Sequence, residues 1–397
     1  MTVRTPIYLD HHATTPPDPR VSARLRETLE RHYGNPASAT HAYGWAAARL
    51  VEEAREAVAG LIGASAREIV FTSGATEADN LALKGLAAAR GDGPGHVVTT
   101  NVEHEAVAGP LADLAARGWR VTAVPVGADG VVDPGAVAAA IAPDTVVVSV
   151  MAAQNEVGTL QPLREIGALC KARGVLFHTD AAQAAGHVPL DVEADGIDLL
   201  ALSGHKLYAV QGVGALYVRR RGPRVALAPL LTGGGQERGL RAGTLNVPGI
   251  VALGEACRIA RAEMTQEGER LRGLAARLLA AVRAGLDGVC LNGDPVRRLP
   301  GSLNLSFAGL LAHRLLAAMP TLAVSSGSAC ASDQAQVSPV LAALGVPRDL
   351  AMASVRIGLG RGTTVEEVDY AAATIVAAVA SLRAQGRQAG LGAPPGA

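Results

Sequence analysis

Between about residues 65 and 220 the sequence alternates strand-length apolar runs with helix-length segments, and this alternation restricts the chain to few folds. The runs are rich in Val, Ile and Leu and are bounded by Gly, Asp or Pro, as strands buried on both faces usually are. The pattern predicts an α/β fold with a mostly parallel seven-stranded sheet covered by helices on both faces. In chain order the runs read IVFTS, HVVTT, RVTAVPV, TVVVSVM, VLFHTD, IDLLALS and GALYVRR.

The remainder of the chain predicts a second, smaller α/β unit. An Ala-, Leu- and Arg-rich helical pattern covers residues 247–286, four further strand-like runs follow, and a last amphipathic helix begins at TTVEEVDY. A chain of 397 residues exceeds the usual size of a single core, so we expect two domains. We place the large domain at 15–260 and build the small domain from 1–14 and 261–397.

Composition excludes several classes of protein. About half of the residues are apolar (49%) and the formal net charge is zero, which argues against a disordered chain and against direct nucleic-acid binding. The first residues lack the apolar stretch of a signal peptide, and no apolar run is long enough to span a bilayer. We therefore expect a cytoplasmic enzyme without membrane contact.

The four cysteines are scattered and include no CxxC pair, so no metal site is expected. Cys170, Cys257 and Cys290 stand in apolar or helical contexts, which predicts inert core thiols. Cys330 differs, because it follows the run of small residues SSGSA.

The segment FTSGATEADN predicts a phosphate site. A strand that ends at Thr72 leads into a helix that starts near Ala75 and Thr76 and has Glu77 in its first turn. The backbone N–H groups at such a helix start can bind an anion. By itself the motif is weak, since any capped helix after a strand looks similar.

The segment LLALSGHKLY contains Lys206, one of only three lysines beside thirty-three arginines. A composition that uses arginine wherever charge suffices suggests that this lysine is present for its amine, which can form a Schiff base with a carbonyl. Ser203 and His205 could bind the same phosphate. Alone, Lys206 would more often be a surface lysine in a strand-to-loop turn.

Asp180, in FHTDAAQ, ends a buried strand, where a carboxylate needs a cationic or protonated partner. A pyridinium nitrogen is one such partner, although an Asp that caps the next helix would look the same. Together with the anion-binding helix start and the lysine, this aspartate supplies the three contacts that pyridoxal 5'-phosphate (PLP) requires: phosphate, aldehyde and ring nitrogen.

The chain resembles a fold-type I PLP enzyme of the class V aminotransferase group, and within that group a group I cysteine desulfurase. The resemblance runs nearly from end to end. It rests on these motifs in family order: LDHHATTP, GNPAS, FTSGATEADN, EHEAV, NEVGTLQP, HTDAAQ, SGHK, GGGQERGLRAGT, SSGSAC and SVRIGLGR.

The resemblance implies a role for each matching residue. Lys206 would hold PLP and move the Cα proton, and His104 would stack on the ring and assist proton transfer; outside the family match, His104 would read as a helix-start histidine in a solvated turn. Arg356 would bind the substrate carboxylate, a task that suits the guanidinium fork. The remaining implied contacts to the cofactor are Ala75, Thr76, Ser203 and His205 at the phosphate, Thr244 from the second subunit of a homodimer, Asp180 at the pyridine nitrogen, and Gln183 and Asn155 on the ring-oxygen side, with Asn155 also near the substrate.

The resemblance also explains the thiol that ends SSGSAC. In the family such a cysteine takes the sulfur of L-cysteine as a persulfide, releases L-alanine, and passes the sulfur to an acceptor for iron–sulfur cluster assembly or tRNA thiolation. The small residues before Cys330 suit a loop that does not dock into a core. Two alternatives stay open: a transaminase or selenocysteine lyase on the same scaffold, and a non-catalytic protein that retains PLP.

Some positions depart from the family pattern. Ala209 and Val210 stand where a Gly-Pro pair is usual after SGHK, so the loop beyond Lys206 is expected to differ. His11 and His12 stand where Tyr or Asn is more common; two neighbouring histidines without a third ligand are weak evidence for a metal.

Overall fold

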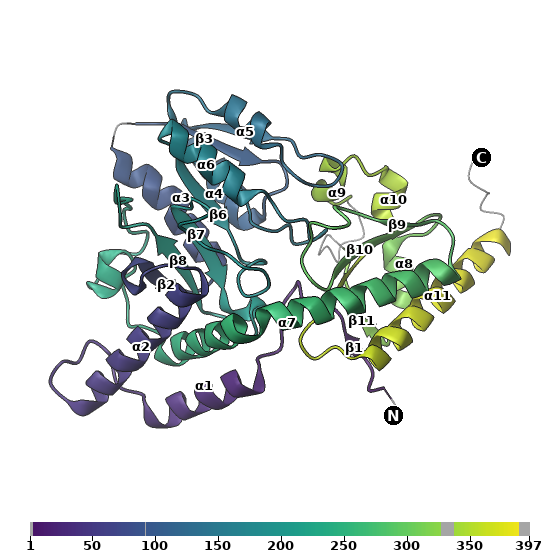
Figure 1. Cartoon of the computed structure of the whole chain (residues 1–397), viewed down its shortest axis with the longest axis horizontal. Helices are drawn as coiled ribbons and strands as arrows, with labels where there is room; N and C mark the ends of the chain where they lie inside the picture. The colour runs from purple at the N-terminus through teal and green to yellow at the C-terminus, as the bar shows by residue number, and fades with distance from the viewer. Residues whose placement is uncertain (1–2, 92, 327–336, 389–397) are drawn as a thin grey trace.

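A computed structural model describes residues 3–91, 93–326 and 337–388 of the chain. Cys330 therefore lies outside the described residues. The described chain has a wide part built on one large sheet and a narrower part at the opposite end, and one long helix runs along both (Figure 1).

The large sheet has seven strands, as the sequence predicts, and each of the seven apolar runs forms one of them. Their register makes every pair parallel except those of β8, which runs antiparallel to both of its neighbours. The order across the sheet is β2 (Ile69–Thr72), β8 (Gly214–Val218), β7 (Leu199–Ser203), β6 (Leu176–Asp180), β5 (Thr145–Ser149), β3 (His96–Thr100) and β4 (Arg120–Val124).

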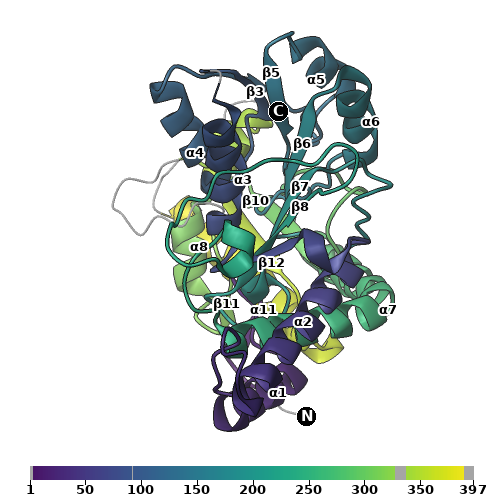
Figure 2. The ribbon, with the colours of Figure 1, turned by 90° about the vertical axis from the view of Figure 1, so that its left-hand side faces the viewer.

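Helices cover both faces of this sheet, because its strands present apolar side chains on both sides. One face packs against α3 (Ala75–Arg90) and α4 (Glu105–Ala116), and the other against α2, α5, α6 and α7. Figure 2 shows α3 and α4 on one side of the strands and α5 and α6 on the other. The bounds are α1 (Pro19–Arg31), α2 (Ala42–Leu61), α5 (Pro134–Ala140), α6 (Leu163–Arg173) and α7 (Val247–Gly285).

The narrower part has its own core and a three-stranded antiparallel sheet in the order β12–β10–β9. The first strand of the chain, β1 (Ile7–Tyr8), joins this part by pairing in parallel with β11 (Leu322–Ala323). The other elements are β9 (Val289–Leu291), β10 (Ser302–Phe307), β12 (Ser354–Gly358), α8 (Ala312–Ala318), α9 (Pro339–Ala343), α10 (Arg348–Met352), α11 (Val365–Gln388) and the short 3₁₀ helices η1 (Ala66–Glu68), η2 (Gly204–Lys206) and η3 (Gln236–Gly239).

We keep the two predicted domains as a proposal, which the two cores support. The small core contains Ile7 and Leu9 together with residues from Leu271 onward, while α7 crosses the proposed boundary at 260/261 without a break. Leu299 and the helices α9 and α10 also pack against the large core, so the two parts share a broad contact.

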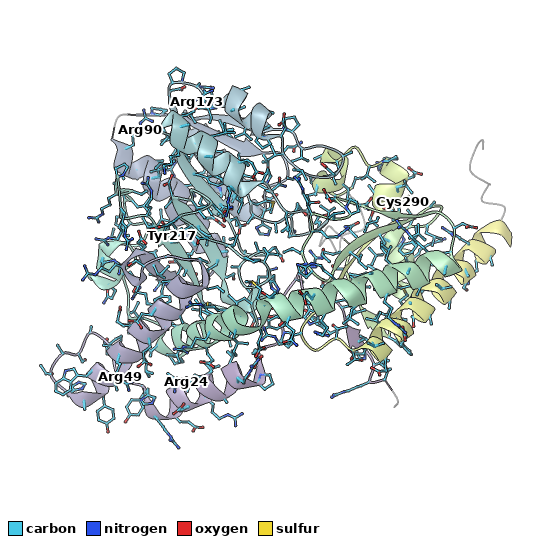
Figure 3. The ribbon with its side chains drawn as sticks, viewed as in Figure 1. Arg24, Arg49, Arg90, Arg173, Tyr217 and Cys290 are labelled. Carbon is cyan, nitrogen blue, oxygen red and sulfur yellow. The ribbon has the colours of Figure 1, made fainter. Side chains whose placement is uncertain are left out.

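One sequence prediction is wrong. Cys170 and Cys257 are buried, but Cys290 is exposed, because it lies on β9 at the edge of the small sheet, where one strand face meets solvent (Figure 3). No helix among the described residues is long and apolar enough to cross a membrane.

Candidate active site

The predicted site residues gather at the carboxyl ends of the large sheet's parallel strands, where ligands bind in such sheets. Asp180 is the last residue of β6 and Ser203 is the last residue of β7. The SGAT turn follows β2, the segment with His104 follows β3, and Asn155 lies beyond β5. Five separate segments thus place polar groups along one edge.

The turn after β2 has the geometry that the predicted anion site requires. Gly74 precedes α3 without a side-chain cap, and helix geometry leaves the first N–H groups, from Ala75 onward, without partners inside the helix. A Cβ on Gly74 would lie 3.7 Å from Ser203 Oγ, which places that hydroxyl beside the turn. Gly214 makes the approach possible, since a Cβ there would lie 2.6 Å from the Cα of Gly74.

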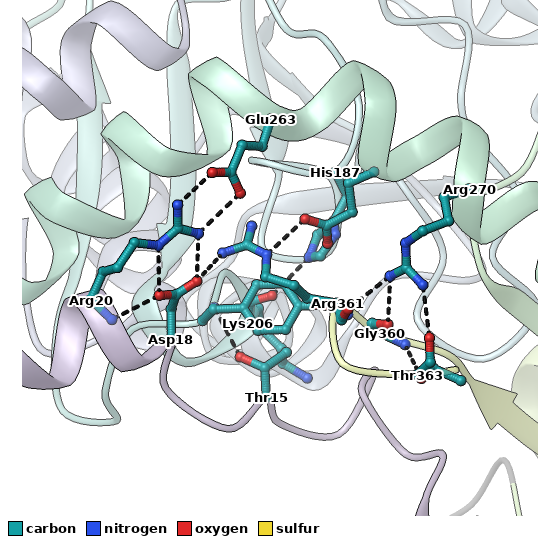
Figure 4. Close-up of polar contacts among 12 residues, drawn as sticks. Thr15, Asp18, Arg20, His187, Lys206, Glu263, Arg270, Gly360, Arg361 and Thr363 are labelled. Atoms are coloured by element: carbon teal, nitrogen blue, oxygen red, sulfur yellow. Dashed lines mark hydrogen bonds and ion pairs between the residues drawn. The ribbon is translucent and has the colours of Figure 1, made fainter. Parts of the chain in front are cut away.

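Lys206 lies in η2, directly after β7, and both its side-chain amine and its backbone carbonyl form hydrogen bonds. The amine donates to Ala13 O at 2.9 Å and to His12 O. Its carbonyl accepts a hydrogen bond from His187 Nε2 at 2.8 Å (Figure 4). Burial, and then the charge of Arg356, lowers the pKa of Lys206 to about 8. A substantial fraction of the amine is therefore neutral near that pH and able to act as a nucleophile.

Asp180 is a buried carboxyl group with little to compensate its charge. It is 5% exposed, and the only hydrogen bond that the described chain gives it comes from the backbone N–H of Ala182, at 2.8 Å. Burial raises its pKa, while that N–H, His104 and Lys206 act in the opposite direction. No arginine or lysine among the described residues forms an ion pair with it, so a protonated ring nitrogen suits this position.

His104 is the N-cap of α4 and is exposed in the described chain. Its Nδ1 accepts the backbone N–H of Ala106 at 3.1 Å, so the neutral ring carries its proton at Nε2. The role of His104 beside the cofactor ring stays a prediction. The residue begins a helix in a solvated turn, and it lies close enough to Asp180 to influence that carboxyl group.

Gln183 does not stand free beside the site. Its Nε2 donates to His12 O at 2.9 Å, and its Oε1 lies 3.4 Å from His12 Nδ1. Burial and the charge of Arg356 hold the pKa of His12 well below its ordinary value, so the imidazole is neutral. In the sequence His12 was noted only as a departure from the family. In the structure its carbonyl oxygen accepts hydrogen bonds from both Gln183 and Lys206. His205, for its part, places Nδ1 3.0 Å from Thr14 Oγ1.

Arg356 is held by a carboxylate that sequence reasoning missed. Its Nη2 lies 3.0 Å from Asp10 Oδ1, and its Nη1 donates to Asn155 O at 3.2 Å. Asp10 also accepts a hydrogen bond from Ser325 Oγ at 3.0 Å. Asp10 stands inside the LDHHATTP motif, and a carboxylate in that motif was the available signal.

A buried polar layer lies on the α3 side of the sheet, below Asp180. His178 Nε2 lies 3.2 Å from Asp79 Oδ1, and its Nδ1 lies 2.8 Å from Ser149 Oγ. Burial lowers the pKa of His178 to about 3 and raises that of Glu103 to about 8. In the sequence these are polar residues within or beside apolar runs, and nothing there indicated which residues they would contact.

Two predicted residues are not brought to Lys206 and Asp180. Thr244 is exposed on the segment between η3 and α7, and no hydrogen bond in the described part of the chain links it to either residue. Cys330 falls outside the described residues. Within 3–91, 93–326 and 337–388, no group of three or more His, Cys, Asp or Glu side chains is placed to hold a metal ion.

These residues fit PLP. The uncapped start of α3 with the hydroxyl of Ser203 suits a phosphate, the amine of Lys206 suits an aldehyde, and the uncompensated carboxyl of Asp180 suits a pyridine nitrogen.

Comparison with known proteins agrees with this geometry. Residues 7–371 match the family model described as aminotransferase class-V. The cysteine desulfurase of Mus musculus is 50% identical over 96% of this chain and 83% of that protein. The chain belongs to the cysteine desulfurase family. The cysteine desulfurase IscS of an Anaeromyxobacter species (strain Fw109-5) is likewise 50% identical, over 96% of this chain and 94% of that protein.

Solved structures related to this cysteine desulfurase family member have the same fold. A protein titled NifS-like superposes with a TM-score of 0.88 at 36% identity and covers 94% of this chain and 99% of its own. DndA from Streptomyces lividans superposes with a TM-score of 0.75 at 40% identity, over 89% of this chain and 99% of its own. The predicted fold-type I class and the predicted PLP dependence are confirmed, because cysteine desulfurases are PLP enzymes.

Proposed function

We propose that this chain is a PLP-dependent cysteine desulfurase that converts L-cysteine to L-alanine and transfers the sulfur to Cys330. The observation that carries the proposal is the 50% identity with named cysteine desulfurases over 96% of the chain. The arrangement of Lys206, Asp180 and the start of α3 supports it, because these are the groups that a PLP enzyme needs.

The described residues divide the binding of the cofactor among them. Lys206 would hold the aldehyde carbon, and Asp180 would pair with the ring nitrogen. The phosphate would lie against Ala75, Thr76, Ser203 and His205. Bound PLP supplies an electron sink that stabilises negative charge on the substrate's Cα.

Other residues handle the substrate and its proton. The guanidinium of Arg356 would bind the α-carboxylate, with Asp10 behind it to fix the orientation of the fork. The amine of Lys206 would also act as the base at the substrate's Cα, a role that suits an amine whose pKa burial lowers to about 8 in the cofactor-free chain. The His104 ring, which carries its proton at Nε2, is the second proton-transfer group.

Cys330 takes the sulfur in this proposal. Its thiolate attacks the sulfur of the substrate; the S–S bond forms while the Cβ–S bond breaks, and its electrons and a proton go to Cβ. The products are alanine and a persulfide on Cys330, which balances one cysteine and one thiol without an added oxidant or reductant.

The test is the release of alanine and sulfide from L-cysteine with a thiol reductant, for the PLP-loaded wild type, for Cys330→Ser and for Cys290→Ser. Cys290 is the matched control, because it is an exposed cysteine on β9 to which the proposal gives no chemical role. We expect equal amounts of alanine and sulfide from the wild type and from Cys290→Ser, and neither product from Cys330→Ser.

Other results would support the alternatives. No alanine from the loaded wild type would contradict the desulfurase and lead to assays with 2-oxo acid acceptors for a transaminase. Turnover of selenocysteine alone would indicate a lyase for that substrate. Equal turnover by Cys330→Ser would remove the thiol from the mechanism.

A homodimer forms part of the proposal. Several large apolar side chains are exposed at the turn between α1 and α2 and in the segment before η3; they are Leu29, Tyr33, Tyr43, Trp45, Leu230 and Leu231. A cavity of about 290 Å³ is lined by Asn35–Ala37 and Gln236–Arg238, so the connection between α1 and α2 lies beside η3, which follows the second of these segments. We propose that a second copy of the chain covers this face and receives Thr244 at its phosphate site. A monomer in sedimentation analysis would contradict this part of the proposal.

The acceptor of the persulfide sulfur stays a prediction, as does the cytoplasmic location. An iron–sulfur scaffold protein and a tRNA-thiolation enzyme are the two candidates. Sulfur-35 transfer from labelled cysteine to each of them, with the wild type and with Cys330→Ser, would distinguish the two.

A further inference from the structure

The segment 236–244 connects the phosphate-binding turn of its own subunit to the exposed Thr244. We infer that Glu237, together with Arg55, is a positioning residue for the phosphate of the cofactor bound in the other subunit, and that it acts by fixing the segment that carries Thr244. This inference rests on the homodimer proposed above.

The backbone of η3 adopts a conformation that neighbouring contacts must maintain. Glu237 (φ 45°, ψ 39°) and Arg238 (φ 59°, ψ 32°) are consecutive non-glycine residues in the left-handed region. L-amino acids other than glycine are rarely found there, and two in succession persist only where surrounding contacts hold them.

The side chain of Glu237 supplies those contacts. It is buried, and both carboxylate oxygens accept hydrogen bonds from the fork of Arg55, each at 2.8 Å. Oε2 also accepts the backbone N–H of Phe71 at 2.8 Å. A buried bidentate pair with a third donor is highly directional, so the position of Glu237 relative to β2 is closely determined.

The Glu237–Arg55 ion pair contacts the edge strand of the large sheet. Among the described strands β2 is terminal and pairs with β8 on one side only, so the backbone groups of its other edge have no strand partner. Glu237 takes the N–H of Phe71, and Arg55 donates to Ile69 O at 2.9 Å. Two residues beyond Phe71 the chain enters the Ser73–Gly74 turn, which begins the phosphate site.

A second contact joins the same segment to the same turn. Arg241 Nε donates to Glu77 Oε1 at 2.9 Å, and Glu77 in turn accepts the N–H of Ser73 at 2.8 Å. Gly243 N donates to Gln236 Oε1 at 3.1 Å and closes the segment on itself. Thr244 follows directly and is exposed, so its position is set by the phosphate turn of its own subunit while its side chain is available to a second subunit.

The consequence is specific to the phosphate. Loosening Glu237 should weaken contacts to the phosphate, above all the one that Thr244 makes in the other subunit, and leave Asp180 and Lys206 of either subunit unaffected. PLP and pyridoxal differ only in the phosphate. The affinity for PLP divided by the affinity for pyridoxal therefore reports on contacts to the phosphate and does not respond to a general loss of folding stability.

The experiment measures that ratio by equilibrium titration of the full-length, cofactor-free protein, for the wild type, Glu237→Gln, Thr244→Val and the double variant. We expect Glu237→Gln to lower the ratio at least about tenfold while the protein stays dimeric, and the double variant to be no worse than Thr244→Val alone. Glu52→Gln is the matched control and should keep the wild-type ratio, because Glu52 binds the same arginine at 3.0 Å from the solvent side.

Mixed dimers test the inference most directly. In a dimer of wild type with the double variant Lys206→Ala and Glu237→Gln, the one intact lysine site receives Thr244 from the altered subunit, and we expect a low ratio. In a dimer of Lys206→Ala with Glu237→Gln, the intact lysine site receives Thr244 from a normal segment, and we expect the wild-type ratio.

Each result has a defined meaning. Equal ratios in the two mixed dimers, an unchanged ratio in Glu237→Gln, or full additivity with Thr244→Val would overturn the inference. An unchanged ratio in Thr244→Val would refute the proposed role of Thr244 itself. If Glu237→Gln does not fold, Arg55→Lys keeps the charge, loses the bidentate fork, and should lower the ratio in the same direction.

Discussion

Replacing Lys206 by Met should make the cofactor-free protein more stable at pH 7. Burial and the charge of Arg356 lower the pKa of this amine to about 8 from the ordinary value of 10.5. At about 1.4 kcal/mol per pKa unit, the charged amine is disfavoured in the folded state by about 3 kcal/mol. Met is similar in length and carries no charge, so it removes this penalty.

Part of the gain is lost with the hydrogen bonds of the amine. Lys206 Nζ donates to His12 O and Ala13 O. His12 O keeps the donor Nε2 of Gln183, so one carbonyl group loses its partner, at a cost of about 1 kcal/mol. The balance of the two effects leaves the Met variant more stable by about 2 kcal/mol at pH 7.

The pH dependence has a definite sign. The pKa of Lys206 is lower in the folded state than in the unfolded state, so below pH 8 the amine is charged in both and the penalty is complete. Between pH 8 and pH 10.5 the folded state loses the proton first and the penalty disappears. The advantage of the Met variant should therefore shrink over this interval and reverse by about 1 kcal/mol above it, where only the lost hydrogen bond counts.

Urea unfolding of the cofactor-free wild type and Lys206→Met, with reductant present, measures the advantage of the variant at pH 7 and its decrease at pH 10. Lys171→Met is the control, since Lys171 is exposed on α6 and its replacement should have a small effect at either pH. A Met variant that is less stable than the wild type at pH 7, or one whose difference is the same at both pH values, would refute the reasoning.

Three further predictions follow from the packing and charges of the site. In Gly214→Ala the new Cβ would lie 2.6 Å from the backbone of Gly74, so urea unfolding should show a loss of about 1–3 kcal/mol together with weaker PLP binding, whereas Gly273→Ala, which meets nothing within 4 Å on α7, should gain about 0.5–1 kcal/mol. Burial holds the pKa of His12 well below its ordinary value of 6.5, so the stability that depends on its neutral ring is complete above pH 6.5 and is lost as the pH falls below it. His12→Asn should therefore lose less stability between pH 7 and pH 5 than the wild type. Equal losses would contradict this. Arg356→Lys loses the fork that meets Asp10 and Asn155 O, so the KM for cysteine should rise by about tenfold or more, equivalent to about 1.4 kcal/mol, with a smaller change in kcat; an unchanged KM would remove the residue from carboxylate binding.

The sheet could be predicted from the sequence because its strands are buried on both faces. A strand such as Leu199–Ser203 is covered on both sides, so it reads as a continuous apolar run that a local pattern reveals. The order of the strands and the antiparallel direction of β8 could not be predicted, since they depend on pairing between distant segments. The prediction that Cys290 is buried was wrong for a related reason, because the burial of a short strand depends on whether it lies at the edge of its sheet.

The site could be predicted as a set of residues but not as a set of contacts. Lys206, Asp180 and the start of α3 each stand in a recognisable motif and lie where the carboxyl ends of parallel strands place them. Their partners come from elsewhere in the chain. Asp10 holds Arg356 from the opposite end of the sequence, and the backbone of His12 holds Lys206.

The sequence by itself determined the chemistry that this chain offers, because an amine, a carboxyl group or a guanidinium brings its reactivity wherever it lies. Only the tertiary structure decided the state of those groups. The pKa of Lys206 depends on burial and on the distant Arg356, and that of Asp180 is raised by burial against the opposing effects of the Ala182 N–H, His104 and Lys206. Glu237 shows the same division: its motif is local, but its role comes from Arg55 and the open edge of β2, which only folding brings together.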